Sequence, residues 1–109
     1  MAMRLGRAFG SGMGQGGVCG VLVGAFMILG LTFQGETDER RARYGTYDLV
    51  REFTGRFRAR HGTIVCKELL GGVDPSTEAG RQQALDQKLF TTICPKLVED
   101  GANILEAMV

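Results

Sequence analysis

The sequence predicts an all-α protein, a small bundle of four to five helices around one glycine-rich buried helix. Residues 18–33 are almost entirely apolar, and two later stretches place apolar residues at helical spacing. No stretch alternates between apolar and polar residues in the way that a half-buried strand does. A chain of 109 residues is long enough for one modest core, so we expect residues 1–109 to form a single domain.

The start of the chain is rich in glycine. Glycine accounts for 17 residues, and ten of these precede residue 36. We expect a short helix over residues 3–9, which the glycine loop 10–17 then interrupts. This loop lacks the lysine and hydroxyl residue of a phosphate-binding loop. The formal charge of +1 gives no reason to expect nucleic acid or an anionic membrane as a partner.

The apolar run 18–33 has two interpretations. Twelve of its 16 residues are apolar, and the others are three glycines and Thr32. A membrane-spanning helix takes about 20 apolar residues and is commonly flanked by aromatic ones, so we favour a helix buried in protein. The alternative is a membrane-associated or partner-binding helical protein with no catalytic activity, which inserts this helix into lipid or an oligomer.

The N-terminal charges do not form a typical secretory signal. A glycine-rich spacer separates them from the apolar run, and no small-x-small cleavage site follows Phe33. We therefore expect a cytoplasmic protein with reduced thiols, and membrane association through residues 18–33 is the alternative.

A long helix is predicted over residues 39–60. Thr37 or Asp38 suits its N-cap, and Gly62 suits its C-cap. Its apolar stripe consists of residues four or fewer positions apart, namely Leu49, Val50, Phe53 and Phe57.

The same helix carries seven arginines between Arg40 and Arg60, with Tyr44 and Tyr47 among them. Arginines interleaved with aromatic residues suit single-stranded nucleic acid. However, Glu39, Asp48 and Glu52 are spaced to pair with Arg43, Arg51 and Arg56, and we expect the tyrosines to share the buried face. We therefore predict a solvated helix face and no nucleic acid.

Two further helical segments are expected before the C-terminus. Residues 64–70 form a short turn of helix that holds Cys66, and Asp74 opens another segment. The last helix begins at Cys94-Pro95, with Cys94 as the N-cap. Its stripe of helical period contains Leu97, Val98, Gly101, Ile104, Leu105 and Met108.

All three cysteines are thus expected at the starts of helices. The positive end of a helix dipole stabilises a thiolate and lowers its pKa, and thiolates attack disulfides or bind soft metals. If these helix starts converge, then Cys19, Cys66 and Cys94 share one site. The alternative is that they are small buried hydrophobes. Their odd number and the absence of a CxxC pair argue against a disulfide framework.

Three blocks of the chain resemble a known family. They are residues 19–24 with 27–31, residues 49–53 with 66–71, and residues 94–98 with 104–106. These blocks are similar to the C_GCAxxG_C_C family of putative redox-active proteins, and all three cysteines fall on cysteine positions of that family. The resemblance implies a redox-active site at Cys19, Cys66 and Cys94. A thiol/disulfide pair, an iron–sulfur cluster and zinc all agree with it, and it does not establish an enzyme.

The resemblance also leaves the partners open. Family members are often encoded near transporters, so a redox partner, a transporter-linked protein and a homo-oligomer are all compatible with it. The chain departs from the family at Val21, where alanine is usual, and in lacking a fourth cysteine on a helix nearer the N-terminus. Either the N-terminus is short or the site uses three cysteines, completed by water, a partner chain or His61. For His61 itself, we expect a role at the end of the preceding helix rather than as a ligand.

Overall fold

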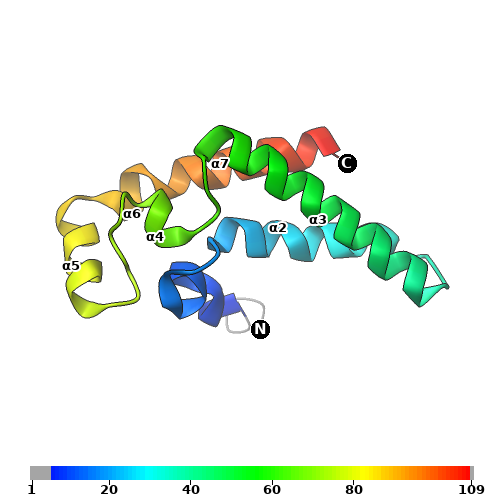
Figure 1. The fold of residues 1–109 in the computed structure, drawn as a ribbon, viewed down its shortest axis with the longest axis horizontal. Helices are drawn as coiled ribbons and strands as arrows, with labels where there is room; N and C mark the ends of the chain where they lie inside the picture. The colour runs from blue at the N-terminus through cyan, green and yellow to red at the C-terminus, as the bar shows by residue number, and fades with distance from the viewer. Residues whose placement is uncertain (1–5, 109) are drawn as a thin grey trace.

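Three helices form the body of the molecule and pack against one another: α2 (Gly20–Gly30), α3 (Glu39–His61) and α7 (Cys94–Met108) (Figure 1). This computed structural model describes residues 6–108. The shorter elements are η1 (Arg7–Phe9), η2 (Gly12–Gly16), η3 (Leu31–Phe33), α4 (Cys66–Leu69), α5 (Glu78–Asp86) and α6 (Leu89–Thr92). No strand occurs within residues 6–108, which confirms the prediction of a small all-α bundle.

The glycine loop forms a left-handed turn, η2. Gly12 and Gly16 have φ angles of +61° and +67°, a region that residues with a Cβ adopt only with strain. The turn closes where the N–H of Gly17 donates to the carbonyl of Gly12 at 3.0 Å. Of the helix expected over residues 3–9, the first residues lie outside the described part, and Arg7–Phe9 forms a single 3-10 turn.

Helix α2 is covered on one face only. Leu22, Ala25 and Leu29 are buried, whereas Met27 and Ile28 are 54% and 52% exposed. The expectation of a helix surrounded by protein is therefore correct for the face towards α3 and α7 and wrong for the opposite face. Within residues 6–108, no helix has both the length and the apolar character needed to cross a bilayer.

Helix α3 begins and ends at the predicted caps. The carboxylate of Asp38 accepts hydrogen bonds from the N–H groups of Arg40 and Arg41, which lack partners within the helix. Gly62 ends the helix in the left-handed conformation, with φ at +80°. Phe53 and Phe57 are completely buried and stack on each other with ring centroids 6.2 Å apart, so the predicted stripe anchors α3 in the core.

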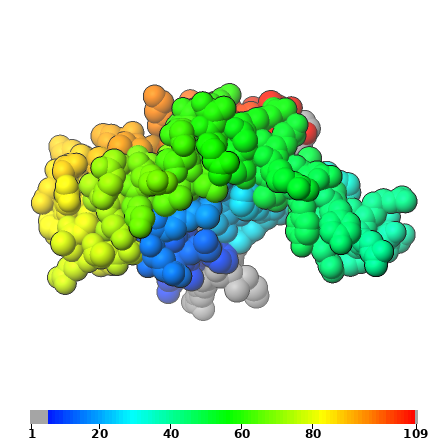
Figure 2. Space-filling view, in the orientation of Figure 1, coloured from blue at the N-terminus to red at the C-terminus, as the bar shows by residue number. Residues whose placement is uncertain are grey.

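The N-terminal half of α3 extends beyond the body of the molecule. Figure 2 shows this part, in teal, projecting at one end of the long axis, which measures 49 Å. The three predicted arginine pairs are present, with Arg51 and Asp48 closest at 2.7 Å. Tyr44 and Tyr47 are 58% and 50% exposed, so their expected place on the buried face is wrong. In this half of α3, Phe33 of η3 lies against Gly45 and leaves both tyrosines exposed.

Local contacts fix the positions of α7 and α5. A Cβ at Gly101 of α7 would lie 2.5 Å from the Cγ1 atom of Val21 on α2, so glycine allows these helices to touch. In α5, the Thr77 hydroxyl caps the helix by accepting from the N–H of Gly80 at 2.9 Å. Helix α7 begins at Cys94, which is its first helical residue rather than the expected N-cap.

Candidate functional site

The structure brings the three cysteines together. Cys19, Cys66 and Cys94 line one cavity of about 320 Å³, which we call the thiol pocket. The remaining lining is apolar or glycine apart from Ser11, and consists of Gly10, Ser11, Gly12, Gly20, Val21, Phe90, Leu97 and Val98. All three cysteines have free thiols. Segments far apart in the sequence therefore converge on one small space.

A backbone bridge places Cys19 beside Cys66. Val18 and Val65 form an antiparallel bridge, and the N–H of Cys19 donates to the carbonyl of Ile64 at 2.8 Å. The N–H of Cys66 donates in turn to the carbonyl of Gly17. Because side chains alternate between the two faces of extended backbone, Cys19 and Cys66 are directed to the same face of this bridge.

The left-handed turn η2 closes over Cys66. A Cβ added at Gly12 would lie 2.9 Å from the Cβ of Cys66 and would also clash with the backbone of Gly17. Glycine at position 12 therefore serves both the backbone conformation and the close approach to the thiol. The glycine loop noted in the sequence forms one wall of the site.

Cys94 enters the pocket from the first residue of α7. Two hydrophobic clusters meet here: Cys19 belongs to the main core between α2, α3 and α7, whereas Cys66 and Cys94 pack against a smaller cluster of Leu70, Val73 and Ala84. Cys19 is 8% exposed, and the other two cysteines are half-buried. The pocket thus lies at the junction between the helical body and the α4–α6 region.

Burial raises the pKa of all three thiols. For Cys66 burial is the largest cause, and the nearby charges of Cys19, Cys94 and Asp74 add to it, which raises its pKa to about 11. Burial also raises the pKa of Cys94, with a further contribution from Cys19. The expectation that helix starts lower these pKa values is wrong, because the loss of solvation outweighs the helix dipole.

Cys19 differs from the other two cysteines in the backbone groups that act on its thiol. Burial raises its pKa as well, but the backbone N–H groups of Val21 and Leu22 oppose this rise. These N–H groups belong to the first turn of α2, where Cys19 is the N-cap. The helix start therefore acts on Cys19 in the predicted direction, without overcoming burial.

The three cysteines are not grouped as the ligands of a metal ion. Among the described residues, no three His, Cys, Asp or Glu side chains are grouped so that they could hold a metal ion. The arrangement therefore gives no support to the zinc or iron–sulfur interpretation of the three cysteines.

His61 lies outside the thiol pocket. As the last residue of α3, it packs on Phe57 with ring centroids 4.6 Å apart, and its Nε2 atom is 3.0 Å from Oδ2 of Asp100 on α7. It lines a separate cavity of about 230 Å³ with residues of α4, α6 and α7. His61 thus joins the end of α3 to α7 and does not complete the cysteine site.

Asp74 is a neighbour of the site that the sequence did not indicate as one. Its Oδ1 atom accepts from both the N–H and the hydroxyl of Ser76, and the hydroxyl is the main reason why the pKa of Asp74 is lowered. A Cβ at Gly16 would lie 2.5 Å from this same oxygen, so Asp74 lies against the turn η2. An Asp-Pro-Ser turn is common in proteins, and its approach to Cys66 depends on how α4 and η2 pack.

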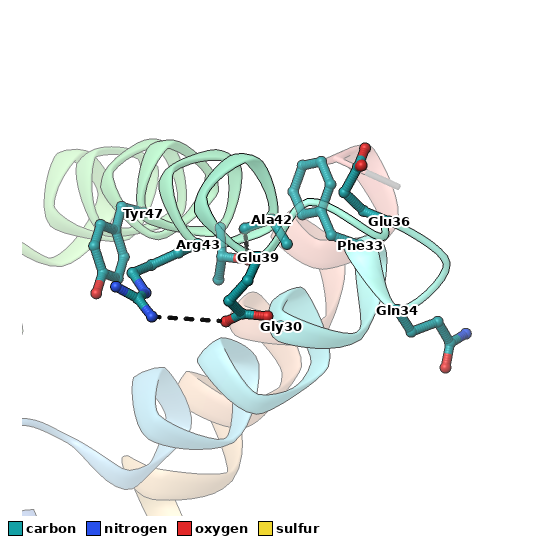
Figure 3. Close-up of a pocket in the computed structure, with 9 residues that line it drawn as sticks. Gly30, Phe33, Gln34, Glu36, Glu39, Ala42, Arg43 and Tyr47 are labelled. Atoms are coloured by element: carbon teal, nitrogen blue, oxygen red, sulfur yellow. Dashed lines mark hydrogen bonds and ion pairs between the residues drawn. The ribbon is translucent and has the colours of Figure 1, made fainter.

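A hollow of about 330 Å³ lies at the other end of α2. Figure 3 shows Phe33, Glu39 and Arg43 around it, with Arg43 and Glu39 paired at 3.9 Å. No cysteine is among its described lining residues, and Gly30, which does line it, ends the helix that Cys19 begins. This hollow is therefore separate from the thiol pocket.

Comparison with known proteins agrees with the position of the cysteines. A family model described as "Putative redox-active protein (C_GCAxxG_C_C)" matches residues 1–108. No curated protein and no solved structure matches the chain. The match extends over almost the whole chain, including all three cysteines of the thiol pocket. The chain belongs to the C_GCAxxG_C_C family of putative redox-active proteins.

Proposed function

We propose that this protein carries out reversible thiol–disulfide exchange, with Cys19 as the attacking thiol and Cys66 or Cys94 as its partner. The observation that carries the proposal is the gathering of three free thiols from three distant segments in one cavity of about 320 Å³. The family description as redox-active supports the same class of chemistry.

The role of Cys19 rests on its surroundings at the start of α2. Thiol–disulfide exchange requires a thiolate, and the backbone N–H groups of Val21 and Leu22 stabilise that form at Cys19. Cys66 and Cys94 each lie close enough for the charge on Cys19 to raise their pKa. Either of these two cysteines is therefore a candidate for the resolving thiol.

The exchange proceeds in two balanced steps. Cys19 loses its proton, and its sulfur attacks one sulfur of a disulfide substrate, so that the substrate S–S bond breaks and the leaving thiolate takes up a proton. The partner cysteine then loses its proton and attacks the Cys19 sulfur, which breaks the mixed disulfide and releases the second substrate thiol. The protein loses two electrons and two protons and gains one disulfide, while the substrate disulfide is reduced to two thiols.

A redox titration tests this proposal. The protein is equilibrated with mixtures of reduced and oxidised dithiothreitol, free thiols are alkylated, and disulfides are located by mass spectrometry. We expect a monomer in which two of the three thiols are lost together and Cys19 forms one half of the disulfide.

Serine variants provide the controls. Cys19→Ser should leave both remaining thiols free across the same mixtures. Of Cys66→Ser and Cys94→Ser, the variant that removes the partner should lose the Cys19 disulfide, and the other should retain it. Far-UV circular dichroism establishes that each variant is folded. Thiols that stay free in the wild-type protein at every mixture would refute the proposal. So would a stoichiometric metal ion in the purified protein that protects all three cysteines from alkylation.

A further inference from the structure

An apolar groove adjoins the thiol pocket. It runs between α2 and α7, has a volume of about 360 Å³, and shares Gly20, Val21 and Val98 with the thiol pocket. Beyond these shared residues it is lined by glycine, alanine and branched alkyl side chains, including Ile28 and Leu105. Ile28 is 52% exposed and Val98 is 57% exposed, so the groove is accessible from solvent.

The lining of these two adjoining cavities disfavours a charged substrate. Of the described residues that line either one, none carries a charged or amide side chain, and Ser11 supplies the one hydroxyl group. A substrate with carboxylate or ammonium groups would lose solvation here without meeting an opposite charge. An alkyl chain would instead cover the exposed faces of Ile28 and Val98, which removes apolar surface from water.

We propose, building on the function above, that the natural substrate is a small uncharged disulfide with an alkyl arm. Its disulfide lies against Cys19 in the thiol pocket, and its arm extends along the groove between α2 and α7. The position of the groove supports this placement, because Gly20, Val21 and Val98 line both cavities and the groove therefore adjoins the thiol pocket. For a cyclic disulfide, the two exchange steps give one protein disulfide and one dithiol in which both substrate sulfurs remain on the same molecule.

Comparison of three disulfides tests the substrate class. The reduced protein is reacted with lipoamide, which is uncharged and has an alkyl arm, with hydroxyethyl disulfide, which is uncharged and has no arm, and with glutathione disulfide, which is charged. Each rate is divided by the rate of the same disulfide with 2-mercaptoethanol, so that the intrinsic reactivity of each disulfide cancels. We expect normalised rates for lipoamide at least roughly tenfold above the other two, the lower end of what apolar pockets achieve per methylene.

A pair of matched variants locates the preference. Ile28→Glu places a charge in the groove outside the thiol pocket, and Leu85→Glu on α5 places the same charge at a position with nearly equal exposure, 53% against 52%. Ile28→Glu should lose the preference for lipoamide and keep its rate with hydroxyethyl disulfide. Leu85→Glu should behave like the wild-type protein.

The outcomes separate this inference from the function on which it rests. Equal normalised rates for all three disulfides would overturn the substrate class and leave thiol–disulfide exchange intact. An equal loss of the preference for lipoamide in Ile28→Glu and Leu85→Glu would also overturn the substrate class. A reduced protein that forms a dimer, and that Ile28→Glu converts to a monomer, would assign the groove to a second copy of the chain. Failure to react with any disulfide would refute the proposed function itself.

Discussion

The raised pKa of Cys66 predicts an unusual pH dependence for the alkylation of this residue. The shift from the ordinary value of 9.0 to about 11 leaves about a hundredfold less thiolate at neutral pH. A more basic thiolate is also more nucleophilic, so the rate constant of the thiolate itself rises about tenfold over two pKa units. Cys66 of the folded protein should therefore react about tenfold more slowly at pH 7 than an unshifted cysteine.

The assay is iodoacetamide labelling across pH 7–12, with the modification of Cys66 quantified by peptide mass spectrometry. The rate should continue to rise above pH 9 and level off near pH 11. The matched control is the same protein unfolded in guanidinium chloride, in which the rate should level off near the ordinary pKa. A plateau of the folded protein at or below pH 9 would refute the assignment.

Two variants separate the causes of the raised pKa of Cys66. Burial is the largest cause, and the charge on Cys19 ranks second, so Cys19→Ser should lower the pKa of Cys66 without returning it to 9.0. Asp74→Asn should lower it less, because Asp74 makes the last-ranked contribution. If Cys19→Ser restores ordinary behaviour, charge rather than desolvation controls this site.

The same shift links protein stability to pH. The unfolded chain releases the Cys66 proton from about pH 9.0, whereas the folded chain holds it until about pH 11. Because the folded state binds more protons in this window, the free energy of unfolding should fall as pH rises from 9 towards 11. Urea unfolding at pH 8, 9, 10 and 11 measures this, and Cys66→Ser should show a weaker decline. An equally steep decline in that variant would assign the pH dependence to other groups.

Further predictions concern stability and the wall of the thiol pocket. Gly101→Ala should lower the free energy of unfolding by about 1–3 kcal/mol, because its Cβ would lie 2.5 Å from Cγ1 of Val21, and adding Val21→Ala should restore most of the loss. Undiminished loss in the double variant would contradict this packing. Asp38→Ala should cost about 0.5–2 kcal/mol by removing the N-cap of α3, as urea unfolding would show, and Asp38→Asn should retain most of that stability. Gly12→Ala should cost at least about 1–2 kcal/mol from the φ of +61° alone, because its Cβ would also meet the backbone of Gly17 and the Cβ of Cys66. It should speed the alkylation of Cys66 by displacing the turn that covers it, and an unchanged alkylation rate would argue against that cover.

Helix α3 shows how much of the fold follows from local sequence. Its caps at Asp38 and Gly62 and its buried Phe53 and Phe57 lie where spacing and side-chain chemistry predicted. Its three arginine pairs form between residues three or four positions apart. These features depend on atoms within one or two helical turns, so they can be predicted without knowing what packs on the helix.

Features that depend on distant segments could not be predicted in the same way. Tyr44 and Tyr47 have the spacing of a buried face but are at least half exposed, because η3 packs against Gly45 in this part of α3 and leaves the tyrosines uncovered. Residues 18–33 are apolar on all sides, so composition did not reveal which face of α2 packs against α7. Burial is set by which elements come together, and the 3.6-residue period of a helix contains no information about that.

The same distinction between local and long-range features applies to the three cysteines. The sequence by itself determined that Cys19, Cys66 and Cys94 stand at or next to the starts of helices, because glycine, proline and apolar spacing define helix ends locally. Only the tertiary structure decided that these three starts meet in one cavity and that their pKa values rise. The physical reason is that a helix dipole arises from the neighbouring peptide groups, whereas desolvation is imposed by side chains from α2, α4, α6 and α7 that are far apart in the chain.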